Sequence, residues 1–102
     1  MIEKMNSYTS SSGNVFEDLG FEKEEAANLL IRADLLIEIR EYIRESGMSL
    51  NEAAEFFGTT KSRISDLKQA RVQKFGIDYL VNMLAKIGKG VKVEIIDLPN
   101  AA

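Results

Sequence analysis

The fold of this chain is decided by residues 49–71, which read SLNEAAEFFGTTKSRISDLKQAR. Ser49 followed by Glu52 is a capping box, in which each side chain satisfies a free backbone amide at the start of a helix. Apolar residues then recur at helical spacing as far as Phe57, and Gly58 supplies the positive φ that ends a helix at little cost. The pattern predicts a helix that begins after Ser49 and ends at Gly58.

A second helix is expected almost at once, over about residues 61–69. Thr60 can cap it, so only a short turn separates the two helices. This second helix offers only Ile64 and Leu67 to a core, while its opposite face carries hydroxyl, amide and charged side chains. Such a helix is either solvated or docked against a polar, anionic surface, and the major groove of DNA admits a helix of this width.

The spacing resembles the helix-turn-helix of the Xre family of Cro-like and phage-repressor-like regulators, with residues 60–69 as its recognition helix. The residues that carry the resemblance are Ala53, Ala54, Gly58, Ile64 and Leu67. Residues 12–21 (SGNVFEDLGF) and 89–95 (KGVKVEI) resemble the antitoxin-like (HigA-type) branch of that family, whose members are paired with a toxin. The resemblance covers residues 12–96 and implies a repressor-like domain that binds DNA.

Two positions depart from the pattern of that family. Leu50 stands where family members usually have a Gln that braces a DNA phosphate, and Ala70 stands where a Gly usually follows the recognition helix. Both differences concern the grip on the DNA backbone and leave the packing of the motif untouched.

Composition narrows the classes of function. The 102 residues, 45% of them apolar, suffice for one domain with a modest core. The absence of Cys and His excludes disulfides, thiolate chemistry, imidazole bases and the usual zinc sites. With no Gly-rich phosphate loop, no enzyme activity, cofactor or metal is expected. No signal peptide or long apolar run is visible, so a cytoplasmic protein without a membrane segment is expected.

The net charge of −3 hides an uneven distribution of charge. Residues 1–47 hold 10 acids and 5 bases, whereas residues 48–102 hold 6 acids and 8 bases. Within residues 61–74, five bases face only Asp66, a local charge of +4. A local patch matters more than the total for binding a polyanion, because phosphate contacts act over about a Debye length of ~8 Å.

The rest of the chain predicts a mainly α fold of four to five helices. Residues 1–14 are polar and aperiodic, as is typical of a flexible arm. The apolar cluster at 15–21 is too short for an element of its own, and a long helix is expected over 23–46. One stripe of that helix (Leu36, Ile39 and Ile43) should cover the helix-turn-helix motif, and a second stripe (Leu29, Leu30, Ala33 and Ile37) should be covered by the cluster or by a partner.

The predicted domain, residues 15–98, ends with a further helix and a strand. Residues 71–76 form a loop in which Phe75 belongs to the core, and a helix is expected over 77–87. Apolar and charged residues alternate over 91–96, which predicts a half-buried β-strand. No second strand is visible, so antiparallel pairing with the same strand of a second copy, in a homodimer, is the economical solution. Residues 99–102 are a short tail.

The hypothesis is a dimeric repressor that inserts one recognition helix per subunit into a palindromic operator. Candidate base contacts are Lys61, Ser62 and Arg63, the last through a bidentate pair with guanine, and Ser65 is a further candidate for contact with DNA. Asp66 either accepts from cytosine or rejects wrong sites. Thr60, Arg71 and Lys74 are candidates for phosphate contacts. Each of these side chains has the alternative of being an ordinary solvated surface residue.

Three roles stay open at this point. The first is an antitoxin that binds a cognate toxin and represses its own operon. The second is a stand-alone Xre-type repressor, and the third is a helical protein-binding module that does not bind DNA. Salt-sensitive binding to duplex DNA separates the first two roles from the third.

Overall fold

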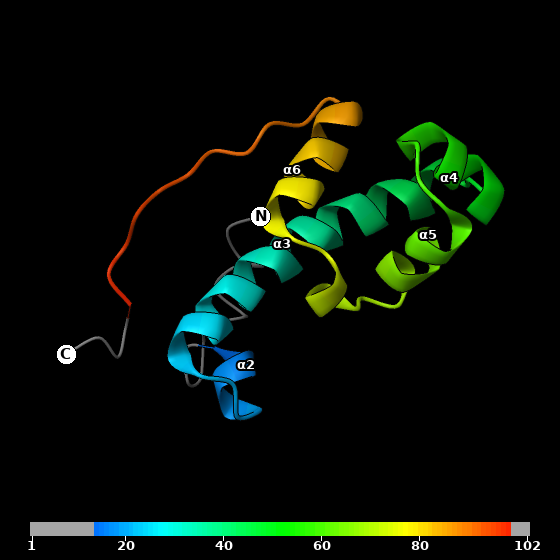
Figure 1. Cartoon of the computed structure of the whole chain (residues 1–102). Helices are drawn as coiled ribbons and strands as arrows, with labels where there is room; N and C mark the ends of the chain where they lie inside the picture. Colours follow the sequence, from blue (N-terminus) through cyan, green and yellow to red (C-terminus); the bar gives the residue numbers. More distant parts are fainter. Residues whose placement is uncertain (1–13, 99–102) are drawn as a thin grey trace. The chain divides into compact units, whose positions relative to one another are not determined.

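A computed structural model describes residues 14–98 of the chain (Figure 1). These residues contain the α-helices α2 (Val15–Asp18), α3 (Lys23–Ser46), α4 (Leu50–Phe57), α5 (Lys61–Lys68) and α6 (Ile77–Lys86), and a 3-10 turn at Val72–Lys74. The prediction of a mainly α fold is confirmed. None of these helices is long and apolar enough to cross a membrane. The chain divides into two compact units, and the division falls after residue 30, within α3.

The first unit contains α2 and the start of α3, together with residues from 92 onward. The prediction that residues 15–21 form no element of their own is wrong, because Asn14 caps a one-turn helix. Its side-chain oxygen accepts from the Phe16 amide at 2.8 Å, and its Nδ2 donates to the Ala26 carbonyl on α3 at 2.9 Å. The rings of Phe16 and Phe21 pack edge to face. Residues 1–13 of the predicted arm, and the tail at 99–102, lie outside the described residues.

The long helix α3 has the predicted bounds, and Gly47, with φ +75°, follows its last turn. The stripe of Leu36, Ile39 and Ile43 is buried, as predicted. The second stripe is covered only in part, because Leu29 is buried while Leu30, Ala33 and Ile37 are half-buried.

The turn between α4 and α5 confirms the predicted helix-turn-helix. Ser49 and Glu52 form both bonds of the capping box, at 3.1 and 2.9 Å, and Gly58 ends α4 with φ +68°. Thr60 caps α5 by accepting from the Arg63 amide at 3.1 Å. Helices α4 and α5 pack directly against each other.

The core of the second unit, residues 31–91, joins α3 to the motif and to α6. It consists of Leu36, Ile39, Ile43, Ala53, Ala54, Phe57, Ile64, Leu67, Phe75, Leu80, Met83 and Leu84. Phe75 lies in the core, as predicted, and is only 1% exposed. Complete burial of a large apolar side chain contributes about 1.5–3 kcal/mol, so this cluster fixes the orientation of α5.

The C-terminal strand predicted over residues 91–96 is not present in this single chain. Residues 89–98 contain neither helix nor strand, and Val93, Ile95 and Ile96 are 76%, 90% and 67% exposed. The physical reason is that a strand needs a second backbone to satisfy its amides and carbonyls, and the described part of one chain offers none.

Candidate nucleic-acid interface

Helix α5 presents a polar face away from its two buried residues, Ile64 and Leu67. Lys61, Ser62 and Gln69 are exposed and Ser65 is half-buried. The Gln69 amide donates to the Ser65 hydroxyl at 3.1 Å. The structure therefore places Lys61 and Ser62, two of the predicted base contacts, and Ser65, a predicted DNA contact, on the accessible side of the motif. No large apolar side chain lies between them.

Arg63 is placed differently from the other predicted base contacts. Its guanidinium carbon lies 4.4 Å from the centre of the Phe75 ring and 4.7 Å from that of Tyr79. Its Nη1 donates to the Lys74 carbonyl at 2.9 Å. The side chain is thus turned toward α6 and the 3-10 turn, away from the polar face of α5. No spacing rule links Arg63 to Phe75 and Tyr79, so only the fold brings this contact to light.

Asp66 forms ion pairs with Arg71 and Lys74, the two cations of the loop that follows α5. Its carboxylate lies 3.1 Å from Arg71 Nη1 and 3.9 Å from Lys74 Nζ, and its side chain is only 13% exposed. Arg71 Nη2 also donates to Gln69 Oε1 at 2.7 Å. The two bases predicted to hold phosphates therefore lie together beside α5, and both remain about half exposed. Because exposed ion pairs are weak, a phosphate can compete with Asp66 for them.

Specific contacts and backbone angles define the two ends of α5. At its start, the Thr60 oxygen accepts from the Arg63 amide, which leaves the hydroxyl hydrogen able to donate to a phosphate. Next to it, the Tyr79 hydroxyl donates to Thr59 Oγ1 at 2.9 Å. After its end, Ala70 takes a left-handed φ of 58°, where the resemblance predicts Gly.

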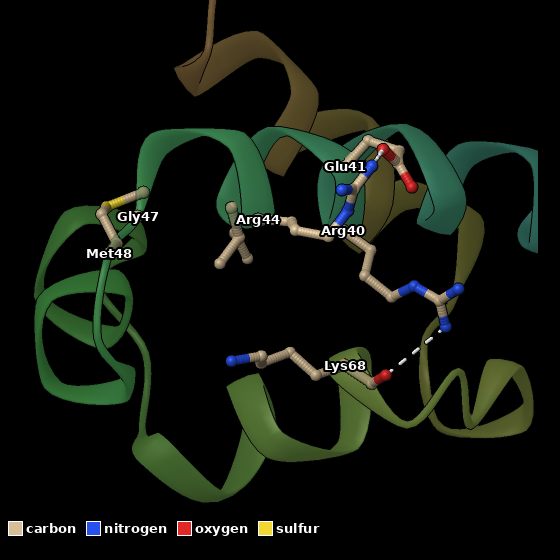
Figure 2. A pocket seen from close by; sticks show the side chains of 7 residues that line it. Arg40, Glu41, Arg44, Gly47, Met48 and Lys68 are labelled. Atoms are coloured by element: carbon tan, nitrogen blue, oxygen red, sulfur yellow. Dashed lines mark hydrogen bonds and ion pairs between the residues drawn. The ribbon is translucent and has the colours of Figure 1, made fainter.

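A basic concavity of about 440 Å³ lies between α3 and α5, in the second unit (Figure 2). Its lining residues are Arg40, Glu41, Ile43, Arg44, Gly47, Met48 and Lys68. Arg40 Nη1 approaches the Lys68 carbonyl at 3.4 Å. Arg44 pairs with Glu41, whose hydrogen bond and charge raise the pKa of Arg44 above its usual range. Sequence reasoning missed this site because Arg40 and Arg44 belong to the acidic half of the chain.

No group of three or more acidic side chains within residues 14–98 is arranged to hold a metal ion. The groups that converge around α5 are hydroxyls, an amide, guanidinium groups, ammonium groups and the carboxylate of Asp66. Hydroxyl, amide, guanidinium and ammonium groups are the groups that bind phosphates and base edges.

Comparison with known families supports the same motif. A family model described as a helix-turn-helix domain matches residues 15–96, from the start of α2 to the C-terminal segment. Comparison with curated proteins gave no match.

Proposed function

The chain belongs to the helix-turn-helix domain family, and on that premise we propose that it is a sequence-specific DNA-binding regulator of transcription. The observation that carries the proposal is the exposed polar face of α5, which the buried Ile64 and Leu67 orient outward. We place this regulator in the cytoplasm as part of the same proposal.

In this proposal, α5 enters the major groove and phosphate contacts hold it there. Lys61, Ser62 and Ser65 read base edges; a Lys side chain donates to the acceptors of guanine, and a Ser hydroxyl suits several bases. Thr60, Arg71 and Lys74 contact phosphates, and so set affinity and register without reading sequence. Asp66 orients Arg71 and Lys74, and its negative charge repels the DNA of wrong sites. Arg63 contacts no base in this proposal; it holds α5 in place through its contacts with Phe75 and Tyr79.

We further propose that two copies pair through residues 91–96. The alternation of Val91, Val93 and Ile95 with charged residues, and their exposure in the single chain, support an antiparallel ladder between copies. A two-fold dimer of this kind matches a palindromic operator with half-sites about 34 Å apart. Sedimentation should show a dimer at micromolar concentration, and Ile95→Pro, which removes a ladder amide, should shift it toward monomer. A monomeric native chain would contradict the pairing.

The resemblance to the Xre family, and to its antitoxin-like branch, supports a finer proposal of a repressor that controls its own operon and binds a cognate toxin. The half-exposed Ile31, within the apolar stretch from Leu29 to Ile37, is one surface available to that partner. The alternative is a stand-alone repressor. Co-purification with the product of an adjacent gene for a small basic protein would favour the antitoxin.

The experiment that tests DNA binding is titration of a labelled duplex from the region upstream of the chain's own gene at several salt concentrations. We expect the logarithm of the association constant to fall linearly with the logarithm of salt. A folded protein that binds no duplex at low salt would overturn the proposal in favour of a protein-binding module.

A further inference from the structure

The concavity between α3 and α5 has the composition of an anion site. Three of its lining residues, Arg40, Arg44 and Lys68, are cations, and Glu41 is the one acid among them. Figure 2 shows the Arg40 side chain reaching from α3 toward α5, and the Lys68 ammonium lying in the space below α3. The two helices thus supply positive charge to one space, which we name the α3–α5 basic pocket.

The cations of this pocket are free to change partner. The contact from Arg40 to the Lys68 carbonyl is long, at 3.4 Å, and involves a neutral acceptor. Arg44 is paired with Glu41, but its side chain is 69% exposed, so the pair is readily exchanged. Guanidinium groups bind phosphate through two parallel hydrogen bonds, which neither present contact supplies.

The pocket lies on the side of α5 that the loop cations do not cover. Lys68 follows Asp66 by two residues, or about 200° around the helix, so the two side chains point in nearly opposite directions. Asp66 holds Arg71 and Lys74 on its own side. Lys61 precedes Lys68 by two turns and shares its side. Positive charge therefore flanks the polar face of α5 on both sides.

That arrangement fits the groove that α5 is proposed to enter. The major groove is about 12 Å wide and is bordered by the phosphates of both strands, while a helix with its side chains is about 10–12 Å across. A helix seated in it faces one row of phosphates on each side. We propose that the α3–α5 basic pocket binds backbone phosphates of one DNA strand, while Arg71 and Lys74 bind those of the other.

This inference rests on the proposed function, and its test separates the two. The variant is Arg40→Ala with Arg44→Ala, measured by salt titration on the upstream duplex and on an unrelated duplex. Loss of one or two phosphate contacts should lower the magnitude of the salt slope by about 0.9 per contact. Affinity should fall by a similar factor, about tenfold, on both duplexes, because phosphate contacts carry no sequence information.

The matched control is Lys86→Ala with Lys89→Ala. It also removes two positive charges, but from exposed residues outside the pocket. It should leave the salt slope close to that of the native chain. Arg40→Lys with Arg44→Lys should keep most of the slope. Lys68→Ala, a truncation at an exposed position, should lower the slope by about 0.9 even if the double alanine variant does not fold.

The possible outcomes differ in meaning. If the native chain binds DNA and the pocket variants match the control, the pocket is not a phosphate site and the proposed function stands. If the pocket variants change base preference instead of general affinity, the assignment to phosphates is wrong. If the folded native chain binds no DNA, the proposed function fails, and this inference fails with it.

Discussion

The guanidinium of Arg63 stacks on the ring of Phe75, with 4.4 Å between the guanidinium carbon and the ring centre. Tyr79 on α6 adds a second ring at 4.7 Å, and the Lys74 carbonyl accepts a hydrogen bond from the same group at 2.9 Å. One side chain of α5 therefore joins this helix to the 3-10 turn and to α6. This contact fixes α5 from the side opposite to Lys61 and Lys68.

Arg63→Ala should lower the free energy of unfolding by about 1–2 kcal/mol, because it removes a cation–π contact and a hydrogen bond together. Arg63→Lys should recover only part of this loss, since an ammonium cannot both stack and donate in the same geometry. Urea unfolding measures the change. Lys61→Ala, at an exposed position on the same helix, is the control and should leave stability almost unchanged. Native stability combined with an altered base preference in Arg63→Ala would show that Arg63 reads bases instead.

Asp66→Asn should tighten binding to any duplex, because it removes a negative charge beside the groove and releases Arg71 and Lys74. The expected gain is about fivefold at low salt, corresponding to about 1 kcal/mol for one charge pair in water, and it should shrink as salt rises. Glu55→Gln removes an equal charge at an exposed position of α4 and serves as the comparison. Weaker binding by Asp66→Asn at every salt concentration would mean that ordering of the two cations outweighs their release.

Ala70→Gly should stabilise the fold, because Ala70 holds a left-handed φ of 58° that costs a residue with a Cβ about 1–2 kcal/mol. The greater entropy of Gly in the unfolded chain offsets part of the gain, so we expect about 0.5–1 kcal/mol. Thermal or urea unfolding measures this change in the free energy of unfolding. The matched substitution Ala85→Gly, in the last turn of α6, should instead destabilise, by less than the ~1 kcal/mol that Gly costs in a helix interior. Equal losses in both variants would rule out strain at Ala70.

Local signals in the sequence were enough to predict most of the fold. The capping box at Ser49 and Glu52, the ends at Gly47 and Gly58 and the apolar stripe of α3 each act within a few residues, so their outcome follows from the sequence alone. The helix α2 was missed because it is a single turn, too short to show apolar periodicity, although the side chain of Asn14 caps it locally at the Phe16 amide. The prediction of a strand over residues 91–96 was wrong for the single chain, because alternating apolar residues form a strand only where a second backbone pairs with them.

The placement of the candidate site residues was predictable only where helical periodicity alone decides which side chains are exposed. Lys61, Ser62 and Ser65 follow from helical periodicity, because the two buried residues of α5 define its open face. The stacking of Arg63, the bridging by Asp66 and the α3–α5 basic pocket each join groups from different segments. Periodicity within one helix says nothing about such contacts, since they depend on how the helices cross.

In the proposed complex, the open face of α5 reads base pairs. The most direct measurement is selection of preferred sequences from a pool of random duplexes by the native chain and by Lys61→Ala with Ser62→Ala. We expect the native chain to enrich one motif, and the variant to lose its preference at one or two of those base pairs while keeping the others, since each specific contact is worth about 1–3 kcal/mol. Enrichment of the same motif by both proteins, or of no motif by the folded native chain, would contradict it.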